Sequence, residues 1–199
     1  MQKIVLVHGS HKTDSVSQKV TNKIIELCNS KIQNLNVEQI QIDHLPFWDE
    51  GLWGMEDKKE KWDIWETISN KLKGADGFIF IAPEYGGMVP PKLSNFLLIV
   101  SGMEVGHKPA LAVTISASRG GAYPISQLRS FCFKNNHLCW LPSHVIIRDA
   151  NLNTEVLKEG SYELDITIYC LKLLSGYAEG LKGVRQLGII DFEKFPYGM

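Results

Sequence analysis

The sequence predicts an α/β protein in which a parallel sheet is covered by helices on both faces. Short apolar runs alternate with longer segments that carry apolar residues at helical spacing, a pattern typical of repeated β-α units. One run, residues 77–82, is almost entirely apolar, as expected for a strand buried on both faces of a parallel sheet. At 199 residues the chain has the length of one domain with a sizeable core. We therefore expect a single domain over residues 1–199.

Five β-α units follow one another along the chain. The first helix carries Val16, Val20 and Ile24 on one face, and the second carries Trp62 and Trp65 at the same kind of spacing. No internal repeat or linker divides the chain. The expected strands are residues 3–8, 37–42, 77–82, 110–116 and 138–141, the last with a possible continuation to residue 147. The expected helices are residues 15–31, 61–73, 91–102, 123–135 and 161–181.

Two strand orders are common in sheets of this kind. The dinucleotide-binding order uses six strands and a glycine-rich first turn, whereas the flavodoxin-like order 2-1-3-4-5 uses five strands. Five predicted strands favour the flavodoxin-like doubly wound parallel sheet. In that order the loops after strands 1, 3 and 4 meet at the carboxyl edge, where open α/β folds bind ligands.

Composition and charge argue against several classes of protein. The formal net charge of −1 gives no electrostatic reason to expect binding to nucleic acid or to an anionic membrane. No apolar run approaches the roughly 20 residues of a membrane helix, and a strand at the very start leaves no room for a signal peptide. Four cysteines without a CxxC motif indicate free thiols. We expect a cytoplasmic protein.

The loop after the third strand, residues 83–91, carries the strongest functional signal. Pro83 ends the strand because it has no N–H, and Gly86 and Gly87 permit positive φ. Such a stiff loop suits a flat heteroaromatic ring held by main-chain hydrogen bonds. Glu84 has no neighbouring histidine or second carboxylate in this loop, so we expect a structural role for it. Tyr85 is expected either to stack on a ring or to fill a gap in the core.

The loop after the first strand, residues 9–17, offers a glycine, a lysine and four hydroxyls just before a helix. It contains neither GxGxxG nor a P-loop motif. Hydroxyls, one lysine and the N–H groups of a helix N-terminus suit a phosphate monoester. Ser15 alternatively serves only as the cap of the helix. These two interpretations of the loop remain open from the residues alone.

The loop after the fourth strand, residues 116–121, repeats the pattern of small residues after a strand. The six histidines lack the spacing of metal ligands, so no metal site is predicted. Asp43 follows the second strand and is expected to be an ordinary loop residue. No acid–base pair is evident, and we nominate no catalytic residue.

Two of these loops resemble motifs of the NADPH-dependent FMN reductase family of flavodoxin-like quinone, azo-dye and chromate reductases. The family pattern G-S-x-R-x-x-S-x-N resembles residues 9–17, and P-E-Y-N-x-x-x-P-x-x-L-K-N resembles residues 83–95. The resemblance implies an FMN-binding domain whose phosphate is held around Ser10, Lys12, Ser15, Val16 and Ser17. It implies that the isoalloxazine is framed by Pro83, Glu84, Tyr85, Gly86 and Gly87 and by Ser116, Ser118, Arg119, Gly120 and Gly121. The chain departs from the family at Lys12, where the family usually has Arg, and at Gly86, where it has Asn.

The resemblance implies an FMN-dependent oxidoreductase that takes electrons from NADPH or NADH. The acceptor would be a quinone, an azo compound, a metal oxyanion or a free flavin. The flavin supplies the redox chemistry, which explains why no acid–base pair is needed. The alternatives are a flavodoxin-type electron carrier, a flavin-free interaction module, and a dehydrogenase of the dinucleotide fold.

Residues 45–53 contain five large apolar side chains in an expected loop. They either pack on the helix of Trp62 and Trp65 or lie at a subunit interface, because a monomer tends to avoid such exposed patches. The matching L-P-[FY] segment of the resembled family lies at an interface near the partner's flavin. We therefore predict a homodimer or homotetramer.

Overall fold

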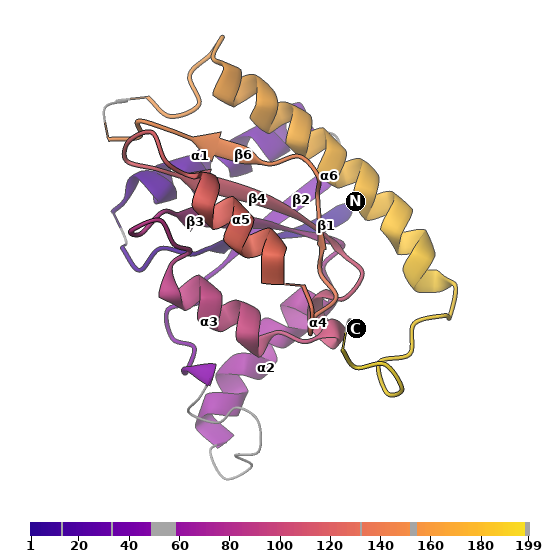
Figure 1. Cartoon of the computed structure of the whole chain (residues 1–199). Coiled ribbons are helices and arrows are strands. Elements are labelled where there is room, and N and C mark those ends of the chain that lie inside the picture. Colours follow the sequence, from indigo (N-terminus) through magenta and orange to yellow (C-terminus); the bar gives the residue numbers. More distant parts are fainter. Residues whose placement is uncertain (13, 33, 49–58, 132, 152–154, 198–199) are drawn as a thin grey trace.

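A central parallel sheet with helices on both of its faces organises the molecule (Figure 1). The computed structural model describes residues 1–12, 14–32, 34–48, 59–131, 133–151 and 155–197. Its strands are β1 (Gln2–His8), β2 (Leu35–Ile40), β3 (Gly77–Pro83), β4 (Pro109–Ile115), β5 (Cys139–Trp140) and β6 (Val145–Ile147). Its helices are α1 (Val16–Lys31), α2 (Lys59–Lys73), α3 (Pro91–Ile99), α4 (Gly102–Val105), α5 (Ala122–Phe131) and α6 (Tyr162–Gln186).

The order of the strands is β2-β1-β3-β4-β5, and every pair is parallel. This is the predicted flavodoxin-like order, which is therefore confirmed. Because β1 pairs with β3 and β3 pairs with β4, the loops that follow these three strands leave the same edge of the sheet side by side. The fold thus places the three candidate loops together.

The fifth position of the sheet is divided between two short strands. β5 pairs with β4 at Pro109 and Ala110, and β6 pairs with β4 further along, at residues 113–115. Pro142 lies between the two strands and has no N–H to donate to the ladder. The predicted strand at residues 138–141 with its continuation is therefore present, but it is interrupted.

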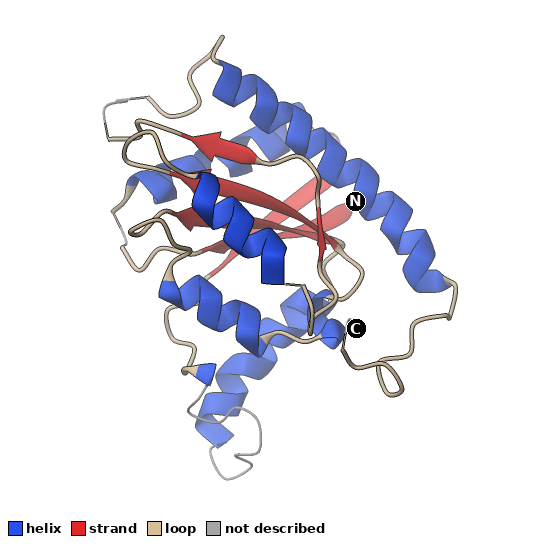
Figure 2. Ribbon diagram, viewed as in Figure 1, coloured by secondary structure: helices blue, strands red, loops and turns tan. Residues whose placement is uncertain are grey.

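The two faces of the sheet bury separate cores. In β1, Ile4 and Leu6 point to one face, which α1 and α6 cover. Val5 and Val7 point to the other face, which α2, α3 and α5 cover. This alternation follows from the two-residue period of a strand, and Figure 2 shows the helices on both sides of the strands. By the same alternation, the last residue of β1, His8, points to the face of Ile4 and Leu6.

Several helix ends differ from the prediction. The helix expected at residues 91–102 stops at Ile99, because Val100 adopts an extended backbone; Ser101 then begins α4 with a capping box to Glu104. α5 ends at Phe131, short of residue 135, whereas α6 runs to Gln186, past the predicted end at residue 181. Among the described residues, no helix is both long and apolar enough to span a membrane.

The segment after α6 returns to the sheet and packs beside α4 (Figure 1). The ring of Phe192 lies against Gly102 and Gly106, so close that a Cβ on either glycine would be within 2.7 Å of it. Its centroid is 5.8 Å from that of His107 and 5.1 Å from that of His137. The C-terminal segment is therefore part of the packed structure.

Candidate functional site

Side-chain hydrogen bonds join the three loops at the carboxyl edge of the sheet. The hydroxyl oxygens of Ser10 and Tyr85 lie 3.1 Å apart and link the first loop to the third. The backbone N–H of Gly121 donates to Glu84 Oε2 over 3.0 Å and links the fourth loop to the third. The structure therefore brings together residues from all three predicted loops.

The first loop turns tightly against the neighbouring strand. A Cβ on Gly9 would lie 2.8 Å from the carbonyl oxygen of Ile81, so the backbone passes here only because residue 9 is glycine. Ser10 is buried, and its Oγ accepts a hydrogen bond from the backbone N–H of Lys12 over 3.1 Å. The side chain of Lys12 is exposed and has no hydrogen-bond or ion-pair partner within the described part of the chain.

Ser15 caps α1, as one of the two interpretations of this loop expected. Its Oγ accepts from the backbone N–H of Gln18 over 3.2 Å, and its backbone is extended. Val16 is the first residue of α1 and is half-buried. The Ser15 Oγ also lies 2.9 Å from Ser17 Oγ, which is buried. The cap therefore belongs to a small network of hydroxyls.

This network reaches a buried histidine at the end of β1. Nε2 of His8 lies 2.9 Å from Ser17 Oγ. Burial lowers the pKa of His8, and the charge of Asp43 opposes this shift. Asp43 lies in the turn after β2, as predicted, and pairs with Lys92 over 2.7 Å. Sequence reasoning treated His8 only as the end of a strand.

The third loop is a tight hairpin centred on two glycines. Tyr85 and Met88 exchange two backbone hydrogen bonds of 3.0 Å around Gly86 and Gly87. The φ angles of these glycines are 58° and 83°, so the predicted positive φ is confirmed at both. Two successive residues with positive φ are typical of a type I′ turn. The N–H groups of both glycines donate no hydrogen bond to the described residues, which leaves them free for a ligand.

Glu84 and Tyr85 have structural partners in this loop. Besides accepting from Gly121, Glu84 anchors the chain through its own N–H, which donates to the carbonyl of Ile115 over 2.8 Å. Tyr85 is half-buried and holds Ser10 with its hydroxyl. Both side chains thus hold loops together, as we expected for Glu84, and Pro83 pairs with Ile115 as the last residue of β3.

The fourth loop is fixed by a segment that the sequence did not connect to it. Ser116 is buried, and its backbone bonds to Ile147 and Ala150. The N–H of Asp149 donates to the carbonyl of Ser118 over 2.7 Å. The guanidinium of Arg148 donates to the carbonyls that follow, those of Arg119 and Gly120. These contacts join residues about 30 positions apart, and no local pattern signals them.

Two glycines of the fourth loop are required by close packing. A Cβ on Gly120 would lie 2.1 Å from the Glu84 carboxylate, and a Cβ on Gly121 would lie 2.4 Å from Ile146. Gly121 also has a φ of 95°, and its carbonyl accepts from Thr114 over 2.8 Å. The side chains of Ser118 and Arg119 are exposed beside these glycines. At Gly120 and Gly121 the loop therefore presents backbone rather than side chains at the edge of the sheet.

The aromatic segment after β2 is divided between the core and the surface. Asn95 of α3 holds it through two hydrogen bonds, one to the carbonyl of Pro46 and one from the N–H of Trp48. Leu45 packs against the core cluster that contains Trp65, whereas Phe47 and Trp48 are 57% and 46% exposed. Residues 49–53 of the predicted segment, and the side chain of Trp62, lie outside the described residues.

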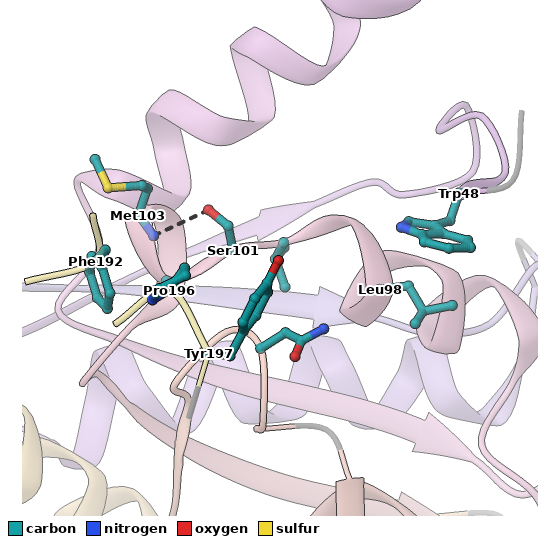
Figure 3. Close-up of a pocket in the computed structure, with 10 residues that line it drawn as sticks. Trp48, Leu98, Ser101, Met103, Phe192, Pro196 and Tyr197 are labelled. Atoms are coloured by element: carbon teal, nitrogen blue, oxygen red, sulfur yellow. Dashed lines mark hydrogen bonds between the residues drawn. The ribbon is translucent and has the colours of Figure 1, made fainter. Parts of the chain in front are cut away.

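Trp48 also borders an apolar pocket of about 420 Å³ beside α3 (Figure 3). Leu98 lines it between Trp48 and the C-terminal segment, which contributes Phe192, Pro196 and Tyr197. This pocket is lined by none of the residues of the three loops. Among the described residues, no group of three or more histidine, cysteine or acidic side chains is placed to hold a metal ion.

The fold and the joined loops together define the class of the protein. A five-position parallel sheet of this order, with three small-residue loops at the switch point of β1 and β3, is the framework of a flavodoxin-like mononucleotide-binding protein. Hydroxyls and the N-terminus of α1 lie in the first of these loops, and the third contains Gly86 with open space around it.

Comparison with known proteins defines the family. The model of the NADPH-dependent FMN reductase family matches residues 2–151, so the chain belongs to this family. The family predicted from the two motifs is therefore confirmed. Its members form a class of oxidoreductases that use FMN and a nicotinamide cofactor, the cofactors that the resemblance implied.

Individual relatives are distant. The chain is 22% identical to an NADPH azoreductase of Bacillus sp. (strain OY1-2) over 94% of this chain and 99% of that protein. It is 26% identical to a quinone reductase of Pseudomonas putida over 53% of this chain and 50% of that protein, so this match spans about half the length of the relative. A flavoenzyme NAD(P)H:(acceptor) oxidoreductase from Paracoccus denitrificans has the same fold, with a TM-score of 0.63, 18% identity and coverage of 92% and 98%.

Proposed function

We propose that this protein is an FMN-dependent NAD(P)H oxidoreductase that passes electrons to a small-molecule acceptor. The observation that carries the proposal is the joining of the three loops through the Ser10–Tyr85 and Gly121–Glu84 hydrogen bonds, in a chain of this family. Bound FMN would supply the hydride and electron transfer, and the protein's part is to bind, orient and shield it. We further propose that residues 1–199 form a single FMN-binding domain.

The first loop is proposed to hold the phosphate of FMN. Ser10, Lys12, Ser15 and Ser17 offer hydroxyl and ammonium donors, and the first turn of α1 from Val16 adds N–H groups and the positive end of its dipole. Lys12 is exposed at the mouth of this loop, where it would act as a point charge.

The third and fourth loops are proposed to frame the isoalloxazine. The free N–H groups of Gly86 and Gly87 would donate to the polar edge of the ring. The backbone of Ser116 and of residues 118–121 would border the ring on the side of β4, while Pro83, Glu84 and Tyr85 hold this loop in place. The stiffness of both loops would keep one face of the ring open to a nicotinamide and then to the acceptor.

A visible absorption spectrum tests this proposal. The purified protein, or protein to which FMN has been added, is expected to show bound flavin that bleaches when NADH or NADPH is titrated and recovers with a quinone or an azo dye. A protein that binds no FMN would contradict the proposal. Flavin that is bound but not reduced by either nicotinamide would instead favour the electron carrier. Carriers of the flavodoxin type are usually strongly acidic, so a net charge of −1 fits that alternative poorly.

We further propose that the protein is a homodimer or homotetramer in the cytoplasm. The exposed Phe47 and Trp48, with Leu98 and Tyr197 around the apolar pocket, form an apolar area of the kind that interfaces cover. The free cysteines Cys28, Cys139 and Cys170 suit a reducing compartment. A monomer in light scattering at micromolar concentration would contradict the oligomer, and cell fractionation tests the location.

A further inference from the structure

A buried histidine lies directly behind the loop proposed for the phosphate. His8 is the last residue of β1 and is only 5% exposed. The alternation of β1 places its side chain on the face of Ile4 and Leu6, beneath α1. Its Nε2 therefore meets Ser17 in the first turn of that helix, at 2.9 Å from Oγ.

From His8, hydrogen bonds run outward to the rim of the loop. Ser17 Oγ lies 2.9 Å from Nε2 and 2.9 Å from Ser15 Oγ, so it bridges the two groups. Ser15 Oγ accepts the N–H of Gln18, which leaves its own proton to be directed elsewhere. When Nε2 carries a proton, it donates to Ser17, Ser17 donates to Ser15, and the proton of Ser15 points outward.

We propose that His8 is a positioning residue of the FMN phosphate site, which directs the hydroxyl protons of Ser17 and Ser15 toward the phosphate and takes up a proton when the dianion binds. This inference rests on the proposed function. The proton comes from the solvent, no covalent bond of the flavin changes, and the product is an imidazolium behind a bound phosphate.

The electrostatics of the site give this coupling its direction. Burial lowers the pKa of His8 in the free protein, so the ring is neutral near pH 7. The charge that acts against this shift is Asp43, which is itself paired with Lys92. The loop adds His11, Lys12 and Asp14. A phosphate monoester brings about −1.5 to −2 charges, which favours the imidazolium and raises the pKa of His8 again.

Linkage then makes the affinity for FMN depend on pH. If binding raises the pKa of His8, binding takes up protons, and FMN affinity gains as the pH falls through the range between the free and the bound pKa. The phosphate itself titrates near pH 6 and opposes this gain. Comparison of the wild type with a His8→Gln variant cancels the phosphate term, because the ligand is the same in both.

The test measures the affinity of flavin-free protein for FMN and for riboflavin, which has no phosphate, from about pH 8 to about pH 5.5. The ratio of wild-type to His8→Gln affinity for FMN is expected to rise severalfold over this range, with about tenfold as the limit for a pKa shift of one unit in His8. For riboflavin the ratio should stay constant. A His44→Gln variant, which removes an exposed histidine at the same edge of the sheet, should match the wild type.

A second measurement needs no variant. Calorimetric titration of the wild type near pH 6.5, in buffers of different ionisation enthalpy, measures the protons exchanged on binding. After the protons released by the phosphate are subtracted, FMN should show net proton uptake, and riboflavin should show none. A ratio for FMN that does not change with pH would overturn the inference. An equal loss of riboflavin affinity in His8→Gln would overturn it as well, because His8 would then act through the fold. If the wild type binds neither flavin, the proposed function fails first.

Discussion

The two edges of the sheet differ in whether their polar groups have hydrogen-bond partners within the chain. At the amino edge, the ammonium of the buried Lys108 donates to three carbonyl oxygens, those of Leu72, Lys73 and Glu104, at 2.8–2.9 Å. At the carboxyl edge, the described residues leave Lys12 and the N–H groups of Gly86 and Gly87 without partners.

The buried carboxylate of the amino edge is equally well supplied. Glu104 accepts from Ser69 Oγ, from Ser101 Oγ and from the backbone N–H of Ser101. Polar groups with hydrogen-bond partners inside the chain, such as Glu104, stabilise the fold. Donors without such partners, such as the N–H groups of Gly86 and Gly87, are the groups that we propose to bind FMN. The difference teaches that charge alone does not mark a site. Among the described lysines, Lys108 has the largest pKa shift: burial lowers its pKa to about 8, and it lies at the edge opposite the three loops.

The largest effect is expected when the amino edge is broken. Lys108→Ala removes the partner of three carbonyls and should lower the free energy of unfolding by roughly 3 kcal/mol, because buried acceptors without partners are costly. Chemical denaturation measures this change. Lys73→Ala, at an exposed neighbour, is the matched control and should cost under about 0.5 kcal/mol. Equal stability of the two variants would contradict a structural role for Lys108.

The converse change at the carboxyl edge should affect binding and not stability. Lys12→Ala is expected to weaken FMN binding by about ten- to a hundredfold, the worth of a hydrogen bond to a charged group. The thermal midpoint without flavin should not move, since this side chain is exposed. Lys19→Ala, an exposed lysine further along α1, serves as the control and should bind FMN normally. Unchanged affinity in Lys12→Ala would exclude its phosphate role.

The glycine hairpin allows the same comparison within one type of substitution. Gly86→Val places a β-branched residue at a φ of 58° and should cost about 1–2 kcal/mol of stability, with a loss of flavin affinity. Gly160→Val provides the control, because Gly160 also has positive φ and open space around it but lies outside the three loops. It should cost similar stability and leave flavin binding intact. Full flavin occupancy in Gly86→Val would show that the hairpin does not hold the ring.

The free energy of unfolding of the flavin-free protein should fall gradually in acid, with contributions from histidines at both edges of the sheet. Burial lowers the pKa of His8 at the carboxyl edge and of His107 at the amino edge. The unfolded chain therefore binds more protons than the folded one once the pH falls below about 6.5, so stability declines from that value downward. Denaturation at several pH values measures the slope, and His107→Gln should reduce it. A slope that is unchanged in this variant would place the titrating group elsewhere.

Much of the fold could be predicted from local patterns. The all-apolar β3 and the alternation of β-α units were enough for the sheet order, and Gly86 and Gly87 were enough for the positive φ. The break between α3 and α4 was missed, although Ser101 and Glu104 have the S-x-x-E spacing of a capping box. The sequence does not show that Glu104 also accepts from Ser69 of α2.

The candidate site could be predicted as a set of loops but not as a network. Each loop shows its small residues in the sequence, yet the bonds that join them, such as Gly121 to Glu84, connect positions far apart. The support of the fourth loop by Arg148 and Asp149 has the same long-range character. The partnership of His8 with Ser17 depends on the side-chain direction of β1 and on the place of α1 above it, which only the folded chain supplies.

The packing of Phe192 couples two neighbouring glycines at α4 to a position far along the chain. Its ring fills the space that a methyl group on Gly102 or Gly106 would occupy. Volume gained at Gly102 must therefore be matched by volume lost at position 192, so positions 102 and 192 are expected to covary. Gly106 is constrained in addition by the backbone carbonyl of Gly102, which a smaller residue at position 192 would not move away. The segment around Phe192 thus limits the size of the side chains that α4 can carry at Gly102.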